Sequence, residues 1–202
     1  MIDGQRFARL VTDAVVRRPA LWRIFRGPLR AMFDGLAPTW ETRLGPHHLW
    51  ALDLALEGIP MPRRVLDLGT GTGVVAIALA ERYAEAEIVG IDLSPGMIEE
   101  ARRKLPPGLA RRVRFEVGDA SALACPDGDF ELVVLSNMIP FPDELARVVA
   151  PGGTLVLSFS RGAETPIYVA PERLRQRLGV RGFTEFAEFS AEPATAFRAK
   201  RG

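Results

Sequence analysis

The ten residues RVLDLGTGTG occupy positions 64–73 and decide the fold of this chain. The first five form a mainly apolar run that predicts a short buried strand. Three glycines follow, at positions 69, 71 and 73. Because glycine has no Cβ, this backbone can turn sharply and approach a ligand closely, and the amides that begin the next predicted helix point toward that ligand. The stretch therefore predicts a ligand site at the first strand-to-helix turn of an α/β fold.

Strands and helices alternate from residue 63 onward. The apolar patterns predict helices at 74–83, 95–105 and 143–149, and strands at 64–68, 87–91, 113–117, 130–135 and 154–159. The run at 130–135 is almost unbroken Val and Leu, as in a strand buried on both faces of a parallel sheet. Crossovers of this length imply a doubly wound α/β sheet.

The C-terminal part departs from this alternation. A helix is predicted at 171–178, followed by strands at 183–189 and 195–200 joined by a short loop, which would form an antiparallel pair. Phe183, Phe186 and Phe189 cannot share one face of a regular strand, because side chains alternate between faces.

The N-terminal 60 residues read as helices. Apolar residues recur with helical spacing from Phe7 to Val15, and Pro19 ends this run. A second amphipathic stretch follows, in which Pro28 predicts a kink or a division. A third helix is predicted to start near Pro46 and to stop at Gly58. We therefore expect a helical segment on the substrate side at 1–60 and a ligand-binding core at 61–202.

Composition narrows the class of protein. The chain has 202 residues, 48% of them hydrophobic, which suffices for a substantial core. Its single cysteine, Cys125, excludes an intrachain disulfide and a cysteine-cluster metal site, so no metal is expected and a cytoplasmic location is favoured. The apolar runs are too short for a membrane span or a signal peptide.

Charge is unevenly distributed. The formal net charge is +1, so there is no strong signal for nucleic-acid binding. Residues 1–33, however, hold seven arginines against two aspartates. These arginines can simply form the solvent-exposed face of the helices. Alternatively, they bind an anionic membrane surface or an acidic partner.

Two further carboxylates follow the next two strands. Asp92 ends the second strand, where its two oxygens can accept from both hydroxyls of a ribose. Asp119 follows the third strand and can accept from an adenine amino group. Ligands in such sheets bind beyond the carboxyl ends of the strands, so both acids are expected beside the glycine turn.

The glycine turn alone does not identify the ligand. Gly71, Gly73 and Ala76 also satisfy the dinucleotide fingerprint G-x-G-x-x-G/A, and Asp92 lies 19 residues after Gly73. A nucleotide-cofactor oxidoreductase is therefore an alternative on these residues.

The wider pattern resembles the class I S-adenosylmethionine-dependent methyltransferases, which carry an acid two residues before the first glycine, as Asp67 stands before Gly69. The resemblance covers roughly half of the chain, in the order and spacing of the family. It rests on segments 67–73, 89–97 (VGIDLSPGM), 118–120 (GDA), 129–134 (DFELVV) and 145–155 (LARVVAPGGTL). It implies a Rossmann-like, seven-stranded sheet whose last strand is antiparallel, with S-adenosyl-L-methionine as cofactor.

The resemblance also assigns cofactor-binding residues. It implies that the methionine end of the cofactor meets Asp67, Gly69, Thr70, Gly71 and Gly73. It implies that Asp92 holds the ribose, that Leu93 and Met97 flank the adenine, and that Asp119 and Ala120 lie at the adenine edge. Ser136 and Asn137 would then lie beside the transferable methyl group. Residues 137–141 read NMIPF and lack the Asn-Pro-Pro-aromatic signature, which disfavours a nucleic-acid amino group as acceptor.

The acceptor side is less explicit. Residues 33–40, FDGLAPTW, are similar to the segment that precedes the fold in quinone-biosynthesis C-methyltransferases, which implies a small-molecule acceptor and a lid role for Trp40. Methyl transfer from a sulfonium does not always need a base. The candidates are Glu41, His47, His48, Arg161, Glu164 and Tyr168, and none is assigned. A non-catalytic module that binds the cofactor remains a third hypothesis.

Overall fold

The computed structural model describes residues 4–45 and 48–202. It contains a seven-stranded sheet in the order β3-β2-β1-β4-β5-β7-β6. Strand β7 is antiparallel to both of its neighbours, and the pairs among β1 to β5 are parallel. This confirms the predicted doubly wound sheet with an antiparallel last strand. The strands are β1 (Arg64–Leu68), β2 (Glu87–Asp92), β3 (Val113–Val117), β4 (Phe130–Ser136), β5 (Val149–Phe159), β6 (Phe183–Ala191) and β7 (Ala194–Arg201).

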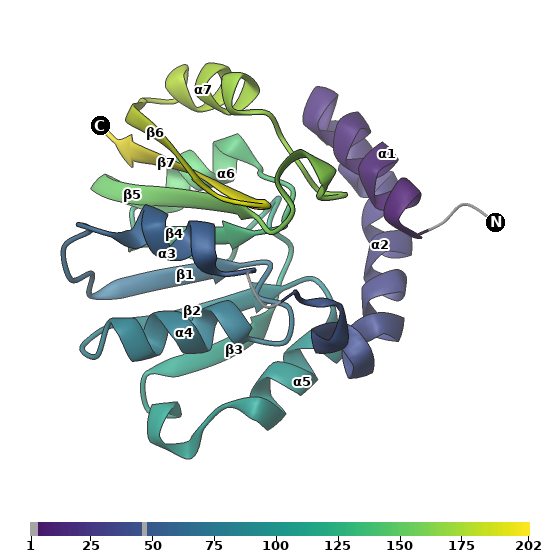
Figure 1. The fold of residues 1–202 in the computed structure, drawn as a ribbon, viewed down its shortest axis with the longest axis horizontal. Coiled ribbons are helices and arrows are strands. Elements are labelled where there is room, and N and C mark those ends of the chain that lie inside the picture. The colour runs from purple at the N-terminus through teal and green to yellow at the C-terminus, as the bar shows by residue number, and fades with distance from the viewer. Residues whose placement is uncertain (1–3, 46–47) are drawn as a thin grey trace.

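Helices cover both faces of the sheet (Figure 1). Apolar residues of α3, α4 and α5 pack on one face, and those of α6 and α7 pack on the other, together with the inner sides of α1 and α2. None of the helices in the described ranges is long and apolar enough to cross a bilayer. The helices are α1 (Gly4–Arg17), α2 (Trp22–Leu36), α3 (Trp50–Leu56), α4 (Val74–Arg82), α5 (Pro95–Lys104), α6 (Pro142–Val148) and α7 (Pro171–Gly179), with short 3-10 turns η1 (Pro19–Leu21), η2 (Ala37–Arg43), η3 (Pro107–Leu109) and η4 (Gly162–Glu164).

The order of the strands reverses at β1. The chain moves outward from β1 through β2 to β3 and then returns to the other side of β1 with β4. The carboxyl ends of these parallel strands therefore share one edge of the sheet, where ligands bind in this class of fold. Helices α1 and α2 lie across this same edge in Figure 1.

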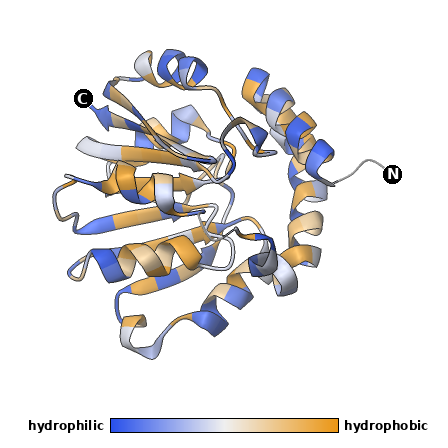
Figure 2. Cartoon of the chain, viewed as in Figure 1, coloured by the Kyte–Doolittle hydropathy of each residue, from blue (hydrophilic) through white to orange (hydrophobic). Residues whose placement is uncertain are grey.

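The helices α1 and α2 are amphipathic, as their apolar periodicity predicts. In α1 the buried side includes Val11, Val15 and Val16, which join the core cluster that also contains Leu66 and Val133 of the sheet. Figure 2 shows hydrophilic and hydrophobic residues alternating along α1, as expected for a helix with one buried side. Burial of this side attaches the N-terminal helices to the core.

Several predicted boundaries differ from the structure. Helix α2 is not divided at Pro28, since it runs from Trp22 to Leu36. Its buried residues Trp22 and Leu29 flank the proline, so packing holds the helix together despite the lost backbone hydrogen bond. Strand β5 starts at Val149, five residues before the predicted strand at 154, because Val149 already pairs with Phe130. The predicted start of the third helix at Pro46 lies outside the described residues, and the helix there is Trp50–Leu56.

Strand β6 explains the three phenylalanines that no regular strand could align. Its register with β7 shifts between Thr184 and Ala187, and Glu185 lies in the left-handed region with a φ of 50°. This bulge places Phe183 and Phe186 in the cluster on the α6 and α7 face, whereas Phe189 packs on the opposite face. Because the bulge inserts one extra residue, Phe183 and Phe186 point to the same face of the sheet although they are three positions apart.

The bulge generates a stability prediction. A left-handed conformation costs a residue with a Cβ about 1–2 kcal/mol, and glycine avoids this cost at the expense of greater freedom in the unfolded chain. We expect Glu185→Gly to raise the free energy of unfolding by about 0.5–1 kcal/mol, measured by urea denaturation. Glu185→Ala is the matched control and should not stabilise the protein. A Gly variant less stable than the Ala variant would contradict this account.

Candidate functional site

The glycine turn joins β1 to α4 in a conformation that requires glycine. Residues Gly69, Gly71 and Gly73 have φ values of 75°, 54° and 85°. A Cβ on Gly69 would lie 2.5 Å from Met138 Cγ, and one on Gly73 would lie 2.8 Å from Phe115 Cζ. These two glycines are therefore needed for close packing of the turn against neighbouring loops and strands.

Gly71 differs from the other two glycines. Within the described residues, a Cβ at this position would meet only the ring of Trp40, whose Nε1 would be 3.5 Å away. A Cβ here would therefore make only an ordinary contact, with the Trp40 side chain of η2. This places Trp40 against the turn, and its role as a lid over a bound cofactor stays a prediction.

Asp67 is the penultimate residue of β1 and is fully buried. Its Oδ2 accepts a hydrogen bond from Thr70 Oγ1 at 2.6 Å. Its Oδ1 is buried and makes no close hydrogen bond in the part of the chain that the structure describes, although the backbone N–H of Ala76 lies near enough to the carboxylate to lower its pKa. Burial raises the pKa of Asp67 to about 7. The turn thus contains a buried acceptor with spare capacity, and the Thr70 hydroxyl is directed at Asp67.

Asp92 connects the first two loops at the carboxyl edge. Its Oδ2 accepts from the backbone N–H of Gly71 at 2.9 Å, and its Oδ1 accepts from the N–H of Ser94 at 2.9 Å. Burial raises the pKa of Asp92 above its ordinary value. The backbone N–H of Leu93 also donates to this carboxylate. Since each carboxylate oxygen can accept two hydrogen bonds, one of the four positions remains. Asp92 is therefore equipped to accept from a donor of a ligand.

Asp119 follows β3, and its carboxylate is held by α2. The Oδ1 atom accepts from Trp22 Nε1 at 2.8 Å, while Oδ2 accepts from Arg26 Nη1 at 3.0 Å. Oδ1 also accepts from the backbone and the hydroxyl of Ser121, at 2.9 and 2.7 Å. Burial alone would raise the pKa of Asp119, but the hydrogen bonds from Ser121, Trp22 and Arg26 outweigh it and lower the pKa.

The remaining predicted cofactor residues lie in the same loops. Leu93 is partly buried, and Met97 and Ala120 are buried. Ser136 ends β4, and Asn137 follows it in the left-handed region with a φ of 51°. The Asn137 Oδ1 accepts from the N–H of Ser160 at 2.9 Å, which ties the end of β4 to the end of β5. All twelve predicted residues therefore lie at or just beyond the carboxyl ends of β1 to β4.

The sequence did not reveal how the N-terminal helices contact these loops. Asp34 Oδ1 accepts from Ser94 Oγ at 2.6 Å and from the N–H of Gly96 at 3.0 Å. On the far side of the edge, Arg9 Nη2 of α1 donates to the carbonyls of Ala163 and Thr165, at 3.1 and 3.0 Å. These are side-chain contacts between segments 60 or more residues apart, and periodicity carries no signal for them.

The side chains proposed as catalytic bases lie in different surroundings. Glu41 accepts from Lys104 Nζ at 2.6 Å and from Thr72 Oγ1 at 3.1 Å, and the Lys104 contact lowers its pKa. Burial raises the pKa of Tyr168, so its phenol keeps its proton at neutral pH. His48 Nδ1 lies 2.8 Å from the carbonyl of Gly45, so that nitrogen carries a proton. His47 lies outside the described residues. Glu41 and Tyr168 are therefore poor bases at neutral pH.

Two other candidates lie in the loop after β5 and serve its backbone structure. The N–H of Arg161 donates to Thr165 Oγ1 at 3.0 Å, and the N–H of Glu164 donates to the carbonyl of Arg161 at 3.0 Å. These contacts close the turn η4 through the backbone of both residues, and they give neither side chain a role as a base. No catalytic base is assigned.

Comparison with known proteins identifies the domain that holds this site. The methyltransferase domain family matches residues 65–153, which include all of the predicted cofactor-binding residues. Residues 65–153 are therefore similar to a methyltransferase domain. They begin in β1, at Val65, and end in β5, at Gly153, so the match spans the glycine turn and both strand-end acids.

Proteins with similar sequences carry the names of different methyltransferases. The demethylmenaquinone methyltransferase of Thermus thermophilus is 45% identical over 142 residues, which is 62% of this chain and 63% of that protein. The malonyl-[acyl-carrier protein] O-methyltransferase of Halorhodospira halophila is 40% identical over 111 residues, which is 52% of this chain and 37% of that protein. The chain thus spans less than two thirds of the length of these relatives.

A solved structure supports the fold assigned to this chain. A SAM-dependent methyltransferase from Aquifex aeolicus superposes with a TM-score of 0.66 at 16% identity, covering 80% of this chain and 96% of that one. At this identity the likeness concerns the arrangement of the strands and helices. It supports the Rossmann-like class that the sequence predicted.

The buried Asp67 generates a pH prediction. Its pKa is about 7 in the folded protein and about 4 in an unfolded chain. A carboxyl group with a raised folded pKa destabilises the fold increasingly as pH rises between these two values. We expect Asp67→Asn to raise the Tm of the ligand-free protein by roughly 5 °C more at pH 8 than at pH 5, measured by calorimetry.

The control for this experiment is Asp13→Asn, which alters an exposed carboxylate on α1. This variant should leave the Tm nearly unchanged at both pH values. Equal Tm shifts for Asp67→Asn at pH 5 and pH 8 would show that burial does not perturb Asp67.

Proposed function

We propose that this chain transfers a methyl group from S-adenosyl-L-methionine to a small-molecule acceptor. The observation that carries the proposal is the placement of three acids at the carboxyl ends of the adjacent strands β1, β2 and β3, two of which bond to the glycine turn. Asp67 lies beneath the turn, and Asp92 accepts directly from the amide of Gly71. Asp119 follows the adjacent strand, whose Gly118 amide donates to the Asp92 carbonyl at 2.9 Å.

The residues present fit this cofactor. Asp92 retains an acceptor position for a ribose hydroxyl, and the buried Oδ1 of Asp67 can serve the methionine end directly or through water. At Gly71 the missing Cβ is faced, within the described residues, only by the Trp40 ring.

When bound, the cofactor supplies an activated methyl group on a sulfonium. The protein must then orient the acceptor and exclude water. Trp40 against the turn, and Asn137 bridging the ends of β4 and β5, are positioned to shape this space.

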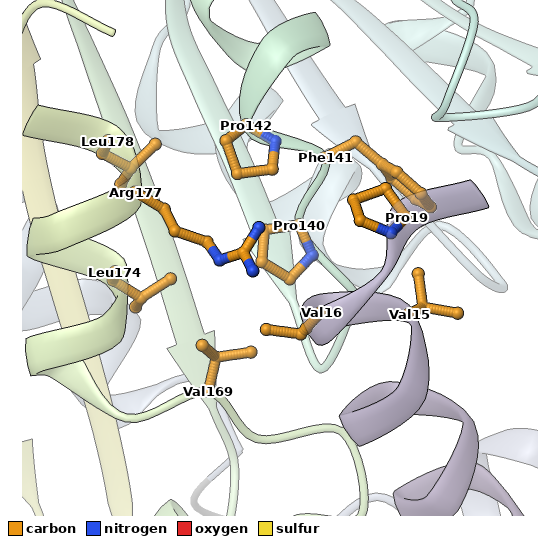
Figure 3. A pocket seen from close by; sticks show the side chains of 10 residues that line it. All are labelled: Val15, Val16, Pro19, Pro140, Phe141, Pro142, Val169, Leu174, Arg177 and Leu178. Atoms are coloured by element: carbon orange, nitrogen blue, oxygen red, sulfur yellow. The ribbon is translucent and has the colours of Figure 1, made fainter. Parts of the chain in front are cut away.

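The acceptor side of the edge is largely apolar. Figure 3 shows a crevice between α1, the loop after β4 and α7, and its lining has one cation, Arg177, whose guanidinium lies near Pro140. The crevice volume is about 10 Å³, room for roughly one water. The apolar lining consists of Val15, Val16, Pro19, Pro140, Phe141, Pro142, Val169, Leu174 and Leu178.

A larger hollow lies at the end of β5. It has a volume of about 190 Å³ and is lined by aromatic rings that include Phe159 and Tyr168, which pack edge to face at 5.0 Å. An aromatic, partly polar lining suits a planar or apolar acceptor. This lining and the 45% identity to a demethylmenaquinone methyltransferase support a quinone-like small molecule as the acceptor. The proposed location of the enzyme is the cytoplasm.

Calorimetric titration tests the donor half of the proposal. We expect saturable binding of S-adenosylmethionine and of S-adenosylhomocysteine, and we expect Asp92→Ala to raise Kd at least tenfold. The reason is the loss of a charge-assisted hydrogen bond to the ribose. Glu99→Ala, which alters an exposed carboxylate on α5, is the control and should leave Kd unchanged.

The outcomes separate the competing hypotheses. Binding of NAD(H) without binding of S-adenosylmethionine or S-adenosylhomocysteine would favour an oxidoreductase and contradict the proposal. Cofactor binding without transfer of labelled methyl to any fraction of a cell extract would favour a non-catalytic module. Label in the lipid or small-metabolite fraction supports the proposed acceptor class, and label in RNA or protein contradicts it.

The exposed side of α1 and α2 supports contact with an anionic membrane surface. Leu10 and Ile24 are 59% and 66% exposed. Arg17, Arg18 and Arg23 are exposed, and none makes an ion pair within the described ranges. Apolar side chains among cations are typical of helices that lie on anionic lipid, where each cation contributes about 1 kcal/mol.

A vesicle assay tests this contact. We expect co-sedimentation with vesicles of phosphatidylglycerol and phosphatidylcholine, little with phosphatidylcholine alone, and a loss at high salt. The triple variant R17Q, R18Q and R23Q should bind at least tenfold more weakly, because about 3 kcal/mol of attraction is removed. Arg111→Gln, on the exposed loop before β3, is the control. Equal binding of the triple variant, or binding to RNA but not vesicles, would contradict the proposal.

A further inference from the structure

Asp119 receives two hydrogen bonds from outside residues 65–153. Trp22 Nε1 and Arg26 Nη1 both come from α2, 97 and 93 residues earlier in the chain. Trp22 is 7% exposed and packs edge to face on Phe141, with ring centroids 5.2 Å apart. The indole is thus fixed by packing, and its N–H is aimed at a carboxylate.

The two oxygens of Asp119 are used unequally. Oδ1 accepts from three donors, namely Trp22 Nε1, Ser121 N and Ser121 Oγ, which exceeds its two lone pairs and leaves no position. Oδ2 accepts only from Arg26 within the described residues, so one lone pair remains. The carboxylate is 19% exposed, and it can therefore accept one further hydrogen bond.

The direction of this remaining acceptor is set by α2. A carboxylate rotates about its last side-chain bond, and two donors on different oxygens fix that rotation. The Arg26 cation also favours the charged form of the carboxylate, which accepts hydrogen bonds and donates none. The donors on α2 therefore decide both the orientation and the chemical character of Asp119.

We propose that Trp22 and Arg26 are positioning residues that make the adenine end of the site selective for a 6-amino purine. The proposal rests on the proposed cofactor. The remaining lone pair of Oδ2 accepts from the exocyclic amino group, while a 6-oxo purine would present an oxygen to a fixed carboxylate and be repelled. Helix α2 thus contributes to recognition of the purine through Asp119.

Selectivity is measured as a ratio of two dissociation constants. Calorimetry compares S-adenosylhomocysteine with S-inosylhomocysteine, which differ at position 6 of the purine. We expect the wild type to bind the adenine form at least tenfold more tightly. Trp22→Phe keeps the ring but removes the N–H, and Arg26→Gln removes the cation at a half-exposed position where folding is preserved. Each should lower the ratio about fivefold, the effect of one hydrogen bond.

A control variant separates selectivity from changes elsewhere on the helix. Arg23→Gln removes an exposed cation of α2 that does not contact Asp119. It should leave the ratio unchanged.

Each remaining outcome decides the inference. An unchanged ratio in both Trp22→Phe and Arg26→Gln overturns it and leaves these residues as attachments of α2. Tighter binding of the adenine form by Trp22→Phe overturns it also, since α2 would then compete with the purine. Failure of the wild type to bind either compound overturns the proposed function, and this inference with it.

Discussion

The parallel alignment of β1 with β2 on one side and β4 on the other is the constraint on which the site depends. Parallel pairing places the carboxyl ends of these strands at one edge. The reversal of strand order at β1 sends the following loops apart and leaves a space between them. Asp67, Asp92 and Asp119 come together there because each ends or follows a strand in this set. The parallel strands thus bring three acids that are far apart in sequence to one edge of the sheet.

Much of this could be predicted from sequence because the signals are local. Apolar runs bounded by turns predicted five parallel strands, and RVLDLGTGTG predicted the site. The glycines were interpreted as one group, yet the structure separates them. A Cβ at position 69 or 73 would collide with Met138 or Phe115. A Cβ at position 71 would meet only the Trp40 ring among the described residues, at ordinary contact distance. That distinction depends on which side chain lies opposite, which spacing cannot show.

The contacts of the N-terminal helices were beyond prediction. Trp22 had the spacing of a core residue, and it is one, but its indole N–H also contacts a loop residue of the core. Asp34 lay within a segment compared with quinone-type enzymes, and nothing in it indicated a partner on α5. Amphipathic periodicity predicts that a helix packs on something and does not say against which loop. The bulge at Glu185 was likewise visible only as a broken alternation.

The position of α1 has a consequence for the order in which the protein can be completed during synthesis. Arg9 bonds to carbonyls that lie 154 and 156 residues later. A ribosome adding roughly 5–20 residues per second needs on the order of ten to thirty seconds to make that interval. Throughout it, the loop that follows β5 is not yet available to α1. The contact between α1 and this loop can therefore form only late in synthesis, after strands β1 to β5 have been made.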